Sequence, residues 1–295
     1  MTTKRILVTG GSGQLAQALA AAGRERIHLV GRPAFNFDKP ETIEAVFRAA
    51  DPWLVVNAAA YTAVDAAEKD EGAALSANRD GPGELARLCA EAGIPLIHVS
   101  TDYVFDGSSP EPYVESDPVS PQSVYGASKL AGEFAVQMSG AQAIILRTAW
   151  VYAATGRNFI RTMLELGRTR DTVRVVADQW GCPTAAADLA VAILAIAARI
   201  ESDGWDDAYW GISHATGSGE TTWHGLALAV FEEAARHGAK VPTTVEAITT
   251  AQYPTPATRP ANSRLNCARL EALFGVRMPD WRASLTRTVN EIFTA

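Results

Sequence analysis

The sequence predicts an α/β fold of the Rossmann type, a doubly wound parallel sheet followed by a smaller C-terminal α/β lobe. Short apolar runs alternate with longer helix-like segments from residue 6 to about residue 150. The first apolar run leads directly into a glycine-rich turn and an Ala-rich helical segment. After residue 150, strand-like runs become fewer and the loops between them become longer. We therefore expect a Rossmann domain at 1–150 and a second lobe at 151–295, with segments crossing between the two.

Composition limits the kinds of partner. The 295 residues can bury a large core, and 47% hydrophobic with 20% charged residues is ordinary for a globular protein. A net charge of -7 offers no basic surface for nucleic acid or anionic membrane. The longest apolar run, 189–198, is too short to span a bilayer, and residues 1–5 show no signal-peptide features. We expect a cytoplasmic protein without membrane or nucleic-acid partners.

The first strand, residues 6–8, is followed by the segment TGGSGQLA at 9–16. In a strand–turn–helix context, Gly10 permits a tight turn and Gly13 lets the backbone approach a pyrophosphate at the helix N-terminus. The expected dinucleotide-binding residues of this turn are Gly10, Ser12, Gly13, Gln14 and Leu15. The alternative is a glycine-rich turn that binds nothing.

The second strand, expected at 26–30, decides which nicotinamide cofactor the sequence favours. Proteins that prefer NAD usually place an acidic residue near its end, where it binds the ribose hydroxyls. Here the chain continues with Gly31 and Arg32. A guanidinium suits a 2′-phosphate, so Arg32 favours NADPH. NADH stays possible because arginine is also common on ordinary protein surfaces.

Further alternation of strands and helices extends the Rossmann pattern. A third strand at 53–57 ends in small residues, where a cofactor can lie against backbone. Loop residues dominate 106–121, a segment that could fold over a site. The other expected strands are 95–100, 143–146, 173–176 and 211–214. The expected helices are 40–50, 63–92 with breaks near Gly72 and Gly81, 125–138, 158–167, 185–199, 223–237 and 281–293.

Tyr125 and Lys129 are four residues apart, so a helix would place both side chains on one face. A phenol normally titrates near ~10, and an ammonium one turn away favours the phenolate. The pair therefore indicates general acid–base chemistry, although a tyrosine beside a solvated lysine gives the same spacing. Thr101 lies at the end of the fourth strand, where its hydroxyl can reach both the phenol and a substrate oxygen.

Together, these features resemble the extended short-chain dehydrogenase/reductase superfamily and, within it, the family of dTDP-4-dehydrorhamnose reductases. The resemblance covers almost the whole chain, and an ordered set of motifs is more specific than any one glycine pattern. The segments that carry it are 13–15, 57–65, 100–107, 124–133, 147–152, 178–184, 221–224 and 259–265.

This resemblance implies NAD(P)H-dependent reduction of the 4-keto group of dTDP-4-dehydro-L-rhamnose to dTDP-L-rhamnose. Tyr125 would protonate the carbonyl oxygen, Lys129 would bind the nicotinamide ribose and lower the pKa of the phenol, and Thr101 would bridge phenol and substrate. Further cofactor contacts would come from Asn36, Phe37, Ala59, Ala60, Tyr61, Thr62 and Val99. Substrate contacts would come from Thr101, Asp102, Val104, Trp150, Asn158 and Arg259.

Metal-bridged dimers of this family carry carboxylates at three places. This chain has Ala18 and Ala187 at two of them and keeps only Glu291. A single carboxylate does not hold Mg²⁺, so we expect no metal and a monomer or weak homodimer. Two other functions stay open: a reductase or epimerase acting on another nucleotide sugar, and a non-catalytic NADP-binding regulatory subunit of the same fold.

Overall fold

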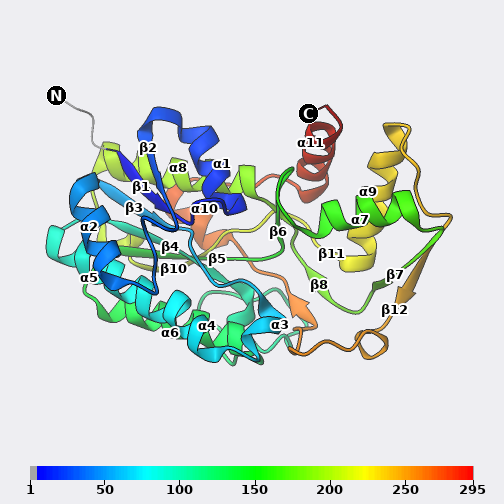
Figure 1. Ribbon diagram of the computed structural model, residues 1–295, viewed down its shortest axis with the longest axis horizontal. Helices are drawn as coiled ribbons and strands as arrows, with labels where there is room; N and C mark the ends of the chain where they lie inside the picture. The colour runs from blue at the N-terminus through cyan, green and yellow to red at the C-terminus, as the bar shows by residue number, and fades with distance from the viewer. Residues whose placement is uncertain (1–4, 295) are drawn as a thin grey trace.

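The structure is a computed structural model that describes residues 5–294 (Figure 1). The first four residues, part of the segment in which the sequence shows no signal-peptide features, lie outside this range. A six-stranded sheet forms the centre, with strand order β10-β5-β4-β3-β1-β2 and every pair parallel. Its strands are β1 (Ile6–Thr9), β2 (Ile27–Val30), β3 (Leu54–Asn57), β4 (Leu96–Thr101), β5 (Ala143–Thr148) and β10 (Gly211–His214).

Helices cover both faces of the sheet (Figure 1). Successive strand residues point to opposite faces, so Ile6 and Val8 enter one hydrophobic core whereas Leu7 enters the other. The first core is closed by α1 (Gln14–Gly23), α8 (Ala186–Asp203) and α10 (Ala268–Phe274). The second is closed by α2 (Pro40–Ala50), α5 (Gly81–Ala92) and α6 (Val124–Met138). Burial on both faces explains why these strands read as continuous apolar runs.

The predicted fold class is confirmed, and the predicted strands lie within one or two residues of the observed ones. Chain segments after residue 150 return to the first domain: β10 pairs with β5, and α8 packs against α1. The division of the chain into lobes at residue 150 stays a prediction.

Of the two predicted helix breaks, the one near Gly72 is observed slightly earlier in the chain, at residues 68–70, and the one near Gly81 is wrong. Helix α3 (Val64–Ala67) ends early, and α4 (Glu71–Leu75), the π-turn η2 (Ser76–Asp80) and α5 then follow one another without a gap. The observed break immediately precedes α4, whose N-cap Asp70 accepts from the Ala73 amide at 3.1 Å. A Cβ on Gly81 would lie 2.1 Å from the Phe37 ring, so this glycine permits close packing.

The remaining elements form a second body beside the sheet (Figure 1). A separate core joins α7 (Phe159–Thr169), α9 (Trp223–Arg236) and α11 (Trp281–Thr294) to the parallel pair β7 (Thr172–Val176) and β12 (Thr244–Ile248). The sequence did not predict β12 or α10. Short strands connect the two bodies: β6 (Val151–Tyr152), β8 (Trp180–Gly181), β9 (Thr184–Ala185), β11 (Thr221–Thr222) and β13 (Asn262–Ser263). Within residues 5–294, no helix has the length and apolar character needed to cross a membrane.

Candidate active site

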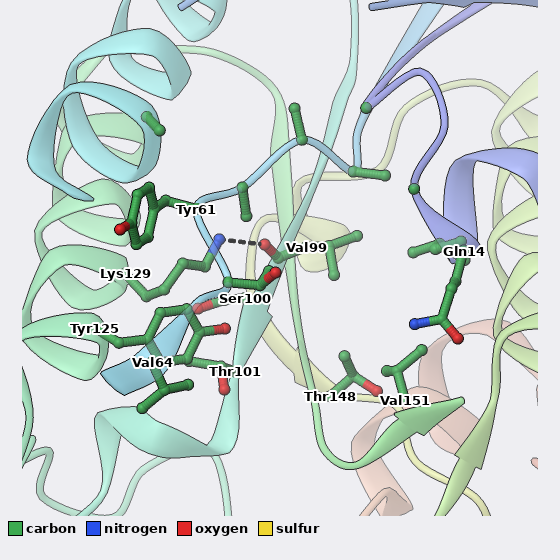
Figure 2. Close-up of a pocket in the computed structure, with 18 of the residues that line it drawn as sticks. Gln14, Tyr61, Val64, Val99, Ser100, Thr101, Tyr125, Lys129, Thr148 and Val151 are labelled. Carbon is green, nitrogen blue, oxygen red and sulfur yellow. Dashed lines mark hydrogen bonds between the residues drawn. The ribbon is translucent and has the colours of Figure 1, made fainter. Parts of the chain in front are cut away.

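A cavity of about 930 Å³ lies at the carboxyl ends of β1, β3, β4 and β5. Chain order reverses between β1 and β3, and ligands of open α/β sheets bind at such a point. Figure 2 shows Gln14 and Val151 on one side of this cavity, with Tyr61, Lys129 and Tyr125 on the other. The cavity therefore joins the glycine-rich turn to the predicted acid–base pair.

The glycine-rich end fits a dinucleotide diphosphate. Gly10 has a φ of +107°, and a Cβ there would lie 2.9 Å from the Ala58 carbonyl oxygen. Helix α1 begins directly after Gly13, and among the described residues no side chain caps it and no acid lies in its first turn. Its first amide groups and the positive end of its dipole therefore face the cavity with nothing to compete with a bound anion.

Arg32 lines the same end of the cavity, with 66% of its side chain exposed. Its guanidinium donates to Asn36 Oδ1 at 3.0 Å and to Asp38 Oδ2 at 2.7 Å. Phe37 also lines the cavity, whereas Asn36 does not. Asn36 therefore contacts Arg32 rather than the cavity, and its predicted contact with the cofactor stays a prediction.

A buried polar network that sequence reasoning missed supports the loop after β3. The Thr9 hydroxyl donates to Asn57 Oδ1 at 2.6 Å, and Asn57 Nδ2 donates to His98 Nδ1 at 2.9 Å. Asn57 Oδ1 also accepts from the Ala59 amide at 3.2 Å. Because these side chains come from β1, β3 and β4, the network ties the loop that carries Ala59 to three strands of the sheet.

Asn78, in η2, joins this loop to α6. Its Oδ1 accepts from the Tyr61 amide at 2.8 Å, and its Nδ2 donates to the Ser128 hydroxyl at 2.9 Å. A Cβ on Gly132 would lie 1.9 Å from the Asn78 carbonyl oxygen, so α6 packs directly on this turn. No spacing rule in the sequence links these distant residues.

The acid–base pair lies in the first two turns of α6. Ser123 caps the helix by accepting from the Gly126 amide at 3.1 Å. Lys129 is 2% exposed, and its ammonium donates to the Val99 carbonyl oxygen at 2.7 Å. In Figure 2, Lys129, Tyr125 and Thr101 converge on one side of the cavity. The spacing of Tyr125 and Lys129 thus places both groups as the sequence predicted, on one face of a helix.

Burial controls the protonation of this pair. It raises the pKa of Tyr125 to about 12, although a hydrogen bond with the Thr101 side chain acts in the opposite direction. The net shift is upward because desolvation penalises the charged phenolate, and a lowering of this pKa by Lys129 stays a prediction. Burial also lowers the pKa of Lys129 to about 8, with Glu133 opposing the change. At neutral pH the site therefore holds a protonated phenol beside a largely charged ammonium.

Asp102 is a second buried acid, 3% exposed, next to Thr101. Its Oδ1 accepts from the Thr101 hydroxyl at 3.0 Å, and its Oδ2 has no hydrogen bond within 3.5 Å among the described residues. Burial raises the pKa of Asp102 to about 6, while the Ser263 and Thr101 side chains act to lower it. A carboxylate that is charged at neutral pH is therefore held in a poorly solvated position.

This arrangement predicts a pH-dependent effect of Asp102→Asn on stability. The pKa of Asp102 is higher in the folded chain than its ordinary value, so its stabilising contribution exists below about pH 4 and is lost as the pH rises through 6. At pH 8 the substitution should raise the free energy of unfolding by up to ~3 kcal/mol, because a shift of two units corresponds to about that energy. Near pH 4 the gain should vanish. Urea unfolding at both pH values measures this difference.

Asp106→Asn is the matched control. Hydrogen bonds from Tyr113 and Ser108 hold the pKa of Asp106 at about 2, so its carboxylate stabilises the fold above pH 4. This substitution should destabilise the protein at pH 8. If the two variants respond to pH in the same direction, the assignment for Asp102 is wrong.

Most of the predicted site residues line the cavity, and four do not. Those at the cavity are Gly10, Ser12, Gly13, Gln14, Leu15, Arg32, Phe37, Ala59, Ala60, Tyr61, Thr62, Val99, Thr101, Asp102, Tyr125, Lys129 and Trp150. The four that do not line it are Asn36, Val104, Asn158 and Arg259. Val104 is fully buried in a small cluster with Phe105 and Leu265.

Asn158 lies one contact away from the cavity, whereas the partners of Arg259 do not line it. Asn158 caps α7 and donates from Nδ2 to Gln14 Oε1 at 2.8 Å, so it orients a side chain that does line the cavity. Arg259 forms an ion pair of 2.7 Å with Asp65, in α3. Their direct contact with substrate stays a prediction.

Trp150 and Trp223 both line the cavity and together form one wall of it, and sequence reasoning placed only the first at the site. Their rings stack with centroids 3.5 Å apart and planes 10° from parallel. Trp150 has a φ of +50°, in the left-handed region that bulky L-residues rarely adopt. Such a conformation costs about 1–3 kcal/mol and persists where the surroundings enforce it, often at functional sites.

No group of three or more His, Cys, Asp or Glu side chains within residues 5–294 is arranged to hold a metal ion.

Comparison with known proteins identifies the family. The family model of the RmlD substrate binding domain matches residues 4–294. A dTDP-4-dehydrorhamnose reductase from Sinorhizobium fredii is 48% identical over 97% of this chain and 96% of its own length. A solved dTDP-4-dehydrorhamnose reductase from Clostridium acetobutylicum superposes with a TM-score of 0.89 at 34% identity, covering 98% of this chain and 99% of that one. The same enzyme from Bacillus anthracis, solved in complex with NADP, also has a TM-score of 0.89, at 32% identity, over 98% of this chain and 100% of that one.

Proposed function

The chain belongs to the family of the RmlD substrate binding domain, the dTDP-4-dehydrorhamnose reductases, and from that premise we propose that it reduces dTDP-4-dehydro-L-rhamnose to dTDP-L-rhamnose with NADPH. One observation carries the proposal beyond the family match. A protonated Tyr125, Thr101 and Lys129 lie in the same cavity as the uncapped turn that fits a dinucleotide diphosphate.

The reaction follows from the state of these side chains. A reduced nicotinamide, when bound, supplies the hydride. Tyr125 donates its proton to the oxygen of the sugar carbonyl. The Thr101 hydroxyl, which donates to Asp102 in the free chain, would turn its single proton to the same oxygen as negative charge develops there. Lys129 holds the ribose of the cofactor and stabilises the phenolate that remains. Because burial keeps the phenol protonated at neutral pH, the site is prepared for reduction of a ketone.

NADPH rather than NADH is expected to bind best, with Arg32 on its 2′-phosphate. Arg32→Ala should weaken NADPH binding by ~1–3 kcal/mol, towards the lower figure because the guanidinium is exposed, and change NADH binding little. Titration of each cofactor by protein fluorescence measures the difference. Arg26→Ala, which removes another exposed and ion-paired arginine, is the matched control. Equal effects of Arg32→Ala on the two cofactors would remove the reason for preferring NADPH.

The direct test is oxidation of NADPH by the purified protein, followed by the absorbance of NADPH. The substrates are dTDP-4-dehydro-L-rhamnose and, in separate reactions, UDP- and GDP-linked keto sugars. We expect turnover with the dTDP sugar and much slower turnover with the others. A preference for a UDP or GDP sugar would assign the chain to another nucleotide-sugar reaction. Tight NADPH binding without turnover of any sugar would instead indicate a non-catalytic binding subunit.

The state of assembly and the location are part of the same proposal. We infer a monomer or weak homodimer, since Ala18 and Ala187 stand where metal-bridged members of the family carry carboxylates. The three cysteines, Cys89, Cys182 and Cys267, are free thiols, which suits a reducing cytoplasm.

A further inference from the structure

Three contacts hold Trp150 in its unusual backbone conformation. Its ring stacks face to face on Trp223, with centroids 3.5 Å apart. Its carbonyl oxygen accepts from the Thr184 amide at 3.2 Å, which fixes the chain just after the left-handed residue. A Cβ added to Gly181 would lie 2.3 Å from Cε2 of the same indole, so the glycine backbone packs directly on the ring. Both indoles line the active-site cavity.

We propose that Trp223 and Gly181 are positioning residues for the sugar: together they hold the Trp150 indole against the substrate. The inference rests on the proposed function, because it assigns the Trp150 wall to the sugar of the nucleotide-sugar substrate. It adds one residue from the second body, Trp223, and one from a connecting strand, Gly181, neither of which belongs to the acid–base machinery.

Trp223 is itself rigidly placed. It is the first residue of α9, whose N-cap Thr222 accepts from the Gly225 amide at 3.0 Å. Its indole Nε1 donates to Gln179 Oε1 at 3.2 Å, and the Phe159 ring lies 4.7 Å from its own. The helix cap, the hydrogen bond of the indole nitrogen and the contact with Phe159 together restrict the motion of the Trp223 side chain. Trp223 can therefore hold a ring that stacks on it in a fixed position.

Gly181 is equally constrained, because it lies in β8 between two other short strands. It pairs with Thr221 of β11 and with Ser263 of β13. The strand therefore cannot move away freely from Trp150 when a side chain is added. Alanine at this position should displace the Trp150 indole while leaving both tryptophans in the chain. The variant therefore tests the position of the indole without removing either aromatic side chain.

The register of the sheet places this wall at the reacting end of the cavity. Thr101 of β4 lies beside Thr148 of β5, and Trp150 follows two residues later. Arg32, expected at the adenosine end of the cofactor, follows the edge strand β2, which β3 and β1 separate from β4. A displaced Trp150 should therefore weaken recognition of the sugar and leave binding of NADPH unchanged.

The experiment compares Trp223→Ala, Trp223→Phe and Gly181→Ala with Trp210→Ala, which removes a half-exposed indole outside the cavity. For Trp223→Ala and Gly181→Ala we expect the KM of the keto sugar to rise at least about tenfold, with the KM of NADPH within about twofold of wild type. Trp223→Phe keeps an aromatic face and should stay within about threefold for both substrates. Trp210→Ala should leave both values unchanged.

Circular dichroism supplies a readout that does not depend on activity. Two indoles stacked face to face couple their transitions, so the wild-type spectrum should contain an exciton couplet that both Trp223 variants lose. Gly181→Ala keeps both indoles but should change the amplitude of the couplet, because their relative placement changes. An unchanged couplet in Gly181→Ala would mean that this glycine does not set the indole position.

The outcomes separate this inference from the proposed function. If the wild type reduces the keto sugar and Trp223→Ala retains its KM, or if the KM of NADPH rises as much as that of the sugar, the inference is overturned. If the wild type reduces no keto sugar, the proposed function fails, while the couplet still reports the stack. If Trp223→Ala does not fold, the other two variants still test the inference. Gly181→Ala must then raise the KM of the keto sugar, and Trp223→Phe must leave it close to the wild-type value.

Discussion

Tyr125→Phe is expected to lower kcat for the keto sugar by roughly 10²–10⁴-fold, the usual contribution of a positioned general acid. The substitution removes one oxygen atom from a side chain that is only 9% exposed, so packing changes little. Lys129 keeps its contact with the Val99 carbonyl oxygen, and the turn at Gly10 is untouched. NADPH affinity should therefore stay close to that of the wild type. The loss should appear in kcat and in kcat/KM together, because the proton is needed only in the transition state.

Single-turnover reduction with saturating NADPH measures this loss without interference from product release. Tyr113→Phe is the matched control, since Tyr113 is a buried tyrosine outside the cavity whose hydroxyl bonds Asp106 at 2.6 Å. Removal of the Tyr113 hydroxyl can lower stability but should leave the rate of the chemical step unchanged. A Tyr125→Phe enzyme with near-normal kcat at neutral pH would show that another group donates the proton.

The sequence was sufficient for the parts of the site whose residues are close along the chain. Strand, glycine turn and helix at residues 6–23 form a local unit, and each step is visible in residue type and spacing. The same holds for Tyr125 and Lys129, because one helical turn defines their separation. The family motifs then placed Thr101 and Trp150 in order, and the cavity brings all four side chains together.

Contacts between distant segments could not be predicted from spacing. Trp223 lies 73 residues beyond Trp150 and meets it only because α9 begins beside β8, a register that no local pattern encodes. Similarly, Asn78 supports Tyr61 from a π-turn, and β10 joins the main sheet after a long excursion. The sequence predicted Tyr125 as the proton donor but not the upward shift of its pKa, since a neighbouring lysine is visible in the sequence and the depth of burial is not.

The largest stability effect is expected at a buried ion pair beneath the acid–base helix. Glu133 lies one turn after Lys129 in α6, and its carboxylate accepts from Arg147 Nε at 2.9 Å and Nη2 at 2.6 Å. The Ser100 hydroxyl also donates to it, at 2.6 Å. The two charged side chains are only 1% and 2% exposed, so neither can be compensated by water. The network joins α6 to β4 and β5, the strands that end in Thr101 and lead to Trp150.

Glu133→Gln should therefore lower the free energy of unfolding by about 3–5 kcal/mol, because it leaves the Arg147 guanidinium buried without its counter-charge. Urea unfolding at pH 7 measures the change. Glu44→Gln, which breaks an exposed pair with Arg48 four residues away, should change stability by no more than about 0.5 kcal/mol. A change of similar size in the two variants would contradict the argument from burial.

Glu133→Leu combined with Arg147→Met provides the decisive comparison. An apolar pair of similar volume removes both buried charges, and such replacements are often neutral or stabilising, so the double variant should be more stable than Glu133→Gln. Its activity should nevertheless stay below that of the wild type. Glu133 raises the pKa of Lys129 against the effect of burial. Without Glu133, Lys129 should lose its proton at lower pH, and the alkaline limb of the kcat/KM profile should shift to lower pH. If the double variant is as stable as the wild type and its pH profile is unchanged, Glu133 serves packing alone and does not maintain the charge of Lys129.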